Sequence, residues 1–200
     1  ADNKNELAAM MSHQMGKTLS QAKQEVDLCA GICEYTAKIG PEQLKDEKRE
    51  LDAEDYGIIS YQPLGVILGM QPWNFPLYQC VRYSAAVIMG GNTTVFKHSE
   101  ICFETAAKIE ELFLEAGLPK NVFTPIYVKS EIADELIAHE LVKGVTFTGS
   151  ASIGKKIAEE SGKHLKKTVL ELGGSDPYIV LEDADIDQAV ETCVQGRIYN

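Results

Sequence analysis

The 200-residue chain carries a formal net charge of -11, which excludes a nucleic acid or an anionic membrane surface as its partner because both demand a basic face. Its 44% hydrophobic and 24% charged residues exclude a disordered or low-complexity chain. No apolar run reaches the roughly 18–20 residues of a membrane span, and the first residues lack a signal-peptide pattern, so we expect a cytoplasmic protein.

The first part of the chain predicts a helix. Apolar residues recur every three to four positions over 19–36, and Thr18 with Gln21 three residues later forms a capping-box pattern. Because glycine and proline interrupt helices, we expect Gly40-Pro41 to end this one.

After a charged segment over 44–55, the chain changes to short runs rich in Val, Ile, Phe and Thr, separated by helical patterns. Such runs are typical of strands buried on both faces, and their alternation with helices predicts an α/β fold with a doubly wound, mostly parallel sheet. Gly117 and Gly162 stand where helix C-caps are needed. The expected strands cover 56–61, 64–70, 93–96, 122–128, 145–147, 168–172 and 178–181, and the expected helices cover 77–89, 103–116, 131–139, 153–161 and 186–194.

Sheets of this kind bind ligands at the carboxyl ends of their strands, so residues that follow strands are the candidates. The first such turn, QPWNFP, is stiffened by two prolines and could aim the Asn74 amide at developing negative charge; alternatively, Asn74 caps the next helix. After 93–96, Lys97 and Glu100 could both reach a ribose, where the acid would repel a 2′-phosphate. The alternative for these two is an exposed ion pair.

Two further strand ends carry candidates. After 145–147, a turn with Gly149 opens into a helix whose first amides could hold a pyrophosphate, although helix starts often carry Gly and Ser and the fingerprint G-x-G-x-x-G is absent. Glu171 stands in an apolar run, where a carboxylate is costly to bury as an ion and suits a proton acceptor near neutrality. Its alternative is an ion pair with Lys166 or Lys167.

Taken together and in order, PWNFP, the lysine of VFKHSE, FTGS with a later glycine, and LELGG resemble the aldehyde dehydrogenase superfamily over essentially the whole chain. The resemblance implies a Rossmann-variant sheet, NAD as the cofactor with NADP as the other form, and oxidation of an aldehyde to an acid through a cysteine thiohemiacetal and thioester. It also implies a homo-oligomer, either a dimer or a tetramer. The implied organisation is cofactor-domain helices over 1–41, an oligomerisation arm over 42–62, an NAD-binding domain over 63–174 and the start of an α/β catalytic domain over 175–200.

The resemblance assigns roles to individual residues. Asn74 would donate to the oxyanion, and Glu171 would be the general base for the hydrolytic water. Arg82 resembles an arginine that grips the far carboxylate in succinate-semialdehyde dehydrogenases, although a lone helical arginine is more often a surface residue. Lys129-Ser130-Glu131 replaces glycines that many relatives carry against the adenine, which leaves that contact open. The cofactor would meet Trp73, Lys97, Glu100, Gly149, Ser150, Ile153, Gly154 and Leu172.

The nucleophile is the exception. The family's cysteine lies in a segment resembling N-x-G-x-x-C whose asparagine matches Asn200, so it would fall about five residues further on, and we expect a parent protein more than twice as long. None of the five scattered cysteines has this context, and Cys193 is expected to pack in its helix. No disulfide framework or metal site is expected. Two alternatives stay open: a CoA-acylating aldehyde dehydrogenase, against which Glu171 argues, and a non-catalytic NAD-binding or assembly module.

Overall fold

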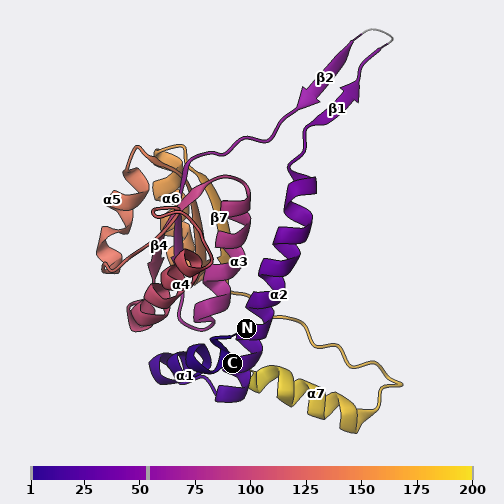
Figure 1. The fold of residues 1–200 in the computed structure, drawn as a ribbon. Helices are drawn as coiled ribbons and strands as arrows, with labels where there is room; N and C mark the ends of the chain where they lie inside the picture. The colour runs from indigo at the N-terminus through magenta and orange to yellow at the C-terminus, as the bar shows by residue number, and fades with distance from the viewer. Residues whose placement is uncertain (1, 53–54, 200) are drawn as a thin grey trace.

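A computed structural model describes residues 2–52 and 55–199. Two helices, α1 (Lys4–Met15) and α2 (Leu19–Gln43), come first, and a two-stranded antiparallel ribbon of β1 (Glu47–Glu50) and β2 (Tyr56–Ile59) follows and projects away from the rest of the chain (Figure 1). The remaining elements are β3 (Val66–Gln71), α3 (Pro76–Met89), β4 (Thr93–His98), η1 (Glu100–Cys102), α4 (Phe103–Glu115), β5 (Phe123–Ile126), η2 (Ser130–Ile132), α5 (Ala133–Ala138), β6 (Val142–Gly149), α6 (Ala151–Lys163), β7 (Lys167–Leu172) and α7 (Ile186–Ile198).

The main sheet has five parallel strands in the order β5-β4-β3-β6-β7, which confirms the predicted α/β fold. From β3 the chain builds outward through β4 to β5, and it then returns to place β6 on the other side of β3. The topological switch point therefore lies between the carboxyl ends of β3 and β6, where such sheets bind ligands.

Apolar residues cover the sheet on both faces. On one face, the buried side chains of α1, α2, α3 and α4 pack together with Phe96 and Phe123. On the other face, Leu68 and Val145 pack against Ile137 of α5 and Ile157 of α6. Within the described ranges, no helix is long and apolar enough to cross a membrane.

The start of α2 is as predicted, because the Thr18 hydroxyl accepts a hydrogen bond from the Gln21 amide at 3.4 Å. The expectation that Gly40-Pro41 ends this helix was wrong. The Leu44 amide donates to the Gly40 carbonyl at 3.1 Å, so the helix continues through Pro41. Gly40 is buried, and a Cβ there would overlap Met89 of α3. Close contact with α3, rather than the end of the helix, therefore accounts for this glycine.

Three other expectations need correction. Gly117 follows α4 with a φ of +91°, as a C-cap glycine should, but Gly162 lies inside α6, and the following turn uses Leu165 at a φ of +53°. The expected helix over 131–139 is shortened to α5 by the preceding η2 turn. The run over 178–181 is exposed and forms no strand, since no strand of the described chain lies beside it for pairing.

Candidate active site and nucleotide cavity

Two adjoining hollows lie at the switch point. The larger, here called the cleft, has a volume of about 1020 Å³, and the smaller, here called the cavity, has a volume of about 550 Å³. Both are within or near the roughly 300–1,000 Å³ of small-molecule sites. Trp73 and Ser150 line both hollows, so the turn after β3 and the start of α6 form their common wall.

Asn74 lies in the turn between β3 and α3 and lines the cleft. The helix-capping alternative for Asn74 was wrong, because Phe75 is the N-cap residue of α3 and no side chain of that position caps the helix. The buried Oδ1 atom of Asn74 has no hydrogen-bond partner among the described residues. The fold therefore does not use this amide oxygen.

Arg82 and Glu171 also line the cleft. They approach from different elements, α3 and β7, and the Arg82 Nη2 atom donates to the Glu171 Oε1 atom. The expected burial of Glu171 was wrong, since β7 is the edge strand and 46% of this side chain is exposed. The alternative pairing with Lys166 or Lys167 was also wrong, because Glu171 pairs with Arg82 and the Lys166 ammonium donates to the Val142 and His139 carbonyls.

The cavity contains one buried cation. Lys97 lines it, and the Lys97 Nζ atom donates to the His98 carbonyl at 3.2 Å, while burial lowers the pKa of this lysine. The alternative of an exposed Lys97–Glu100 ion pair was therefore wrong, because Lys97 is buried. Glu100 is exposed and does not contribute to the described wall of the cavity, whereas Ser99 and Ser130 do. Sequence reasoning missed Ser99 and left the contact of the Ser130 segment open, because neither residue type nor spacing distinguishes these serines from turn serines.

The turn from β6 into α6 has the expected form. The Ser150 hydroxyl accepts a hydrogen bond from the Ile153 amide at 3.4 Å and so caps α6, and half-exposed Ile153 lines the cavity. A Cβ at Gly154 would overlap Leu172, so this glycine lets α6 lie close to β7. Leu172 itself lines the cleft and not the cavity.

A Cβ at Gly149 would overlap the Phe147 ring, which lines the cavity beside this glycine. The cavity thus combines a helix N-terminus, a buried ammonium and serine hydroxyls. These groups suit the phosphates and hydroxyls of a nucleotide, because helix-start amides and cations both favour anions.

None of the five cysteines lines either hollow. Cys29, Cys80 and Cys102 are buried, and burial raises the pKa of each thiol, that of Cys102 to about 11. The expected packing of Cys193 was wrong: α7 buries no residue and leaves this thiol exposed. No cluster of metal-ligating side chains occurs among the residues that the structure places.

Comparison with known proteins gives a consistent result. Residues 1–200 match the model of the aldehyde dehydrogenase family. The succinate-semialdehyde dehydrogenase [NADP(+)] of Deinococcus radiodurans is 44% identical over 195 residues, which are 98% of this chain and 41% of that protein. The succinate semialdehyde dehydrogenase [NAD(P)+] Sad of Escherichia coli is 40% identical over 195 residues, 98% of this chain and 42% of that protein.

A solved structure is similar throughout. The succinic semialdehyde dehydrogenase from Streptococcus pyogenes, crystallised in complex with NADP+, aligns with a TM-score of 0.94 and 42% identity, covering 99% of this chain and 43% of that one. The chain thus spans about two fifths of the length of the proteins it matches.

Proposed function

Since this chain belongs to the aldehyde dehydrogenase family, we propose that it is the cofactor-binding part of an enzyme that oxidises succinic semialdehyde to the free acid. The observation that carries the proposal is the presence of Asn74, Arg82 and Glu171 in one cleft, next to a cavity suited to a nucleotide. The relatives described above are succinate-semialdehyde dehydrogenases, and their substrate is the one that the residues of this cleft would have to recognise.

Each of the three side chains has a distinct task. The Asn74 amide would donate a hydrogen bond to the oxyanion that develops at the aldehyde carbon, where a fixed donor stabilises the transition state. Glu171 would accept the proton of the hydrolytic water. Arg82 would bind the far carboxylate of the substrate, for which a guanidinium offers two parallel hydrogen bonds.

The cofactor would be a nicotinamide dinucleotide, which supplies the hydride acceptor. Lys97 would hold a ribose or its phosphate, the start of α6 at Ser150 would hold the pyrophosphate, and Trp73 would border the nicotinamide end, where the cavity meets the cleft. We propose that the 2′-phosphate of NADP is accepted. The acid that the sequence placed there, Glu100, lies outside the described wall of the cavity, and Ser99 takes its place.

We further propose the domain organisation that the family implies. Residues 1–41 and 63–174 would form the cofactor domain, 42–62 the oligomerisation arm and 175–200 the start of the catalytic domain, although Ala1, residues 53–54 and Asn200 lie outside the described residues. The nucleophile would be a cysteine other than the five of this chain, since none of these lines the cleft.

The test uses the full-length protein and follows reduced nicotinamide formed from succinic semialdehyde. We expect turnover with NADP, a free acid as product with or without CoA, and a loss of about 100-fold or more in kcat for Asn74→Ala. A thioester formed only with CoA would favour the acylating alternative. A full-length protein that binds the dinucleotide but oxidises no aldehyde would favour the non-catalytic module.

A further inference from the structure

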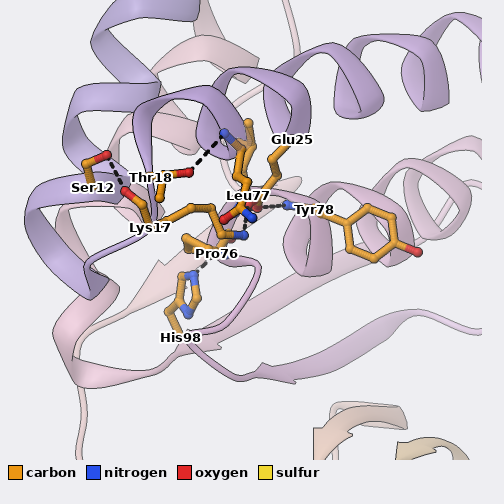
Figure 2. A network of polar contacts seen from close by, with 9 residues as sticks. Ser12, Lys17, Thr18, Glu25, Pro76, Leu77, Tyr78 and His98 are labelled. Carbon is orange, nitrogen blue, oxygen red and sulfur yellow. Dashed lines mark hydrogen bonds and ion pairs between the residues drawn. The ribbon is translucent and has the colours of Figure 1, made fainter. Parts of the chain in front are cut away.

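A buried ion pair lies beside the start of α3, which directly follows the turn that carries Asn74 (Figure 2). Lys17 follows α1, Glu25 belongs to α2, and the Lys17 Nζ atom is 2.6 Å from the Glu25 Oε2 atom. Both side chains are only 1% exposed. Burying two charges costs free energy, which further hydrogen bonds to the same groups can offset. The other contacts of Lys17 and Glu25 therefore indicate what the pair does in this fold.

Glu25 caps a helix to which it does not belong. Its second oxygen, Oε1, accepts hydrogen bonds from the backbone amides of Leu77 and Tyr78, each at 2.9 Å. These are the second and third residues of α3, whose first amides donate no bond to the side chain of the helix's own N-cap residue. The carboxylate therefore satisfies two unpaired donors and lies at the positive end of the α3 dipole.

Lys17 and His98 hold the same segment from two other directions. The Lys17 Nζ atom is 3.7 Å from the centroid of the Phe75 ring, and the Lys17 carbonyl accepts a 2.5 Å bond from the Ser12 hydroxyl. The Ser99 amide donates to the Nδ1 atom of His98, so the neutral ring carries its proton on Nε2 and donates to the Pro76 carbonyl at 3.0 Å.

The four residues after Asn74 are therefore each held by a side chain from another part of the fold. Asn74 itself lacks a partner for its Oδ1 atom among the described residues. Its direction then depends on the backbone on which it stands. Just after Asn74, the Lys17–Glu25 pair contacts the Phe75 ring and holds the backbone amides of Leu77 and Tyr78.

We propose that Lys17 and Glu25 are positioning residues that aim the Asn74 amide at the reacting carbonyl. This inference rests on the proposed function of Asn74 as the oxyanion donor. An oxyanion donor works only within a narrow range of distance, so a small displacement of the turn lowers kcat. The proposed phosphate and ribose contacts of the dinucleotide are unaffected, because Lys97 and the start of α6 lie on other elements.

The test is a double-mutant cycle in the full-length protein, with Glu25→Gln and Asn74→Ala made singly and together. Glu25→Gln is expected to lower kcat about tenfold in the wild-type background and by less than about twofold once Asn74 is an alanine, because coupled residues do not add. Dissociation constants for NADP should stay unchanged. An equal loss of kcat in both backgrounds would overturn the proposal.

The matched control is Asp27→Asn. It breaks the Lys4–Asp27 pair, which also joins the first two helices but is exposed, with 35% and 60% of the two side chains accessible. We expect kcat to stay within about twofold for this variant. A loss as large as that of Glu25→Gln would mean that any disturbance between α1 and α2 lowers activity, and would overturn a specific role for the buried pair.

A third measurement does not depend on activity. Hydrogen exchange over residues 72–82 is expected to quicken in Glu25→Gln, while exchange in α6 stays the same. If Glu25→Gln does not fold, the neutral variant Lys17→Met/Glu25→Gln replaces it, because it leaves no unpaired buried charge. Unchanged exchange at Leu77 and Tyr78 would overturn the anchoring. A wild-type protein that oxidises no aldehyde, with exchange as expected, would contradict the proposed function of Asn74 and leave the anchoring supported.

Discussion

Arg82 of α3 and Glu171 of β7 form an ion pair within the cleft, although 89 residues separate them in the sequence. The side chains are 40% and 46% exposed, so the pair contributes little to stability. Both residues have other tasks in the proposed reaction. We infer that the far carboxylate of the substrate replaces Glu171 as the partner of Arg82, and that this exchange leaves Glu171 able to accept a proton from water.

Replacement of Arg82 by alanine should lower kcat/KM much more for a substrate that carries a carboxylate than for an uncharged aldehyde. Loss of a paired partner from a desolvated charge costs about 2–5 kcal/mol, so kcat/KM for succinic semialdehyde should fall by roughly 30-fold or more. Butanal, which has no second charge, should be affected by less than about threefold. Steady-state kinetics with both aldehydes checks this. Equal losses on the two substrates would show that Arg82 has a structural role.

Glu171→Gln should remove the proton acceptor and retain the shape of the side chain. General base catalysis contributes about 100- to 10,000-fold, so kcat should fall within that range while the KM for NADP stays the same. Glu160→Gln is the control, because Glu160 also pairs with a cation, Lys163, but lies on α6 outside the cleft. Full activity in Glu171→Gln would show that another group activates the water.

Ser99, rather than Glu100, should determine whether the 2′-phosphate is accepted. Ser99→Glu would add a second carboxylate to the cavity, which Asp134 already lines. Its repulsion of the 2′-phosphate should shift the ratio of kcat/KM values toward NAD by about tenfold or more. Glu100→Gln should change this ratio by less than about threefold, since Glu100 is exposed. A larger change in this ratio for Glu100→Gln than for Ser99→Glu would contradict the prediction. It would instead support the interpretation from the sequence alone, in which NAD is preferred and Glu100 is the selective residue.

His98 should make stability depend on pH. Burial lowers the pKa of His98 from 6.5 to about 4, so between these values the unfolded chain binds a proton that the folded chain does not. The free energy of unfolding therefore falls as the pH falls from 6.5 toward 4, by up to about 1.4 kcal/mol per pH unit, and is unaffected above 6.5. His98→Gln should flatten this part of the profile, measured by unfolding midpoints. His13→Gln, at an exposed position on α1, should not.

The ribbon of β1 and β2 should join subunits. It projects from the fold and exposes Tyr56, Ile58 and Ile59, and a two-stranded ribbon is marginally stable without a partner. Ile58→Asp should therefore lower the mass of the full-length protein in light scattering. Leu165→Asp, which places the same charge at a residue 93% exposed outside the ribbon, should leave the mass unchanged. A wild-type monomer at micromolar concentration would contradict an oligomer.

Local patterns in the sequence were sufficient for the fold class. Short apolar runs alternate with helical patterns, and each run became a strand wherever a neighbouring strand was present to pair with it. The run over 178–181 had no such neighbour in the described chain and stayed irregular. Because carboxyl ends of parallel strands share one edge, the sequence placed Asn74, Lys97 and Ser150 at one edge of the sheet, and in the structure they line the two hollows there.

Only the tertiary structure decided which side chains meet. Glu25 caps α3 from 52 residues away, Arg82 rather than a lysine pairs with Glu171, and Ser99 faces the cavity where Glu100 turns to solvent. Periodicity fixes which face of an element is apolar, because burial depends on the spacing of residues along one helix or strand. Periodicity does not say which helices and strands pack against one another. Polar contacts between elements that are distant in the sequence depend on that packing.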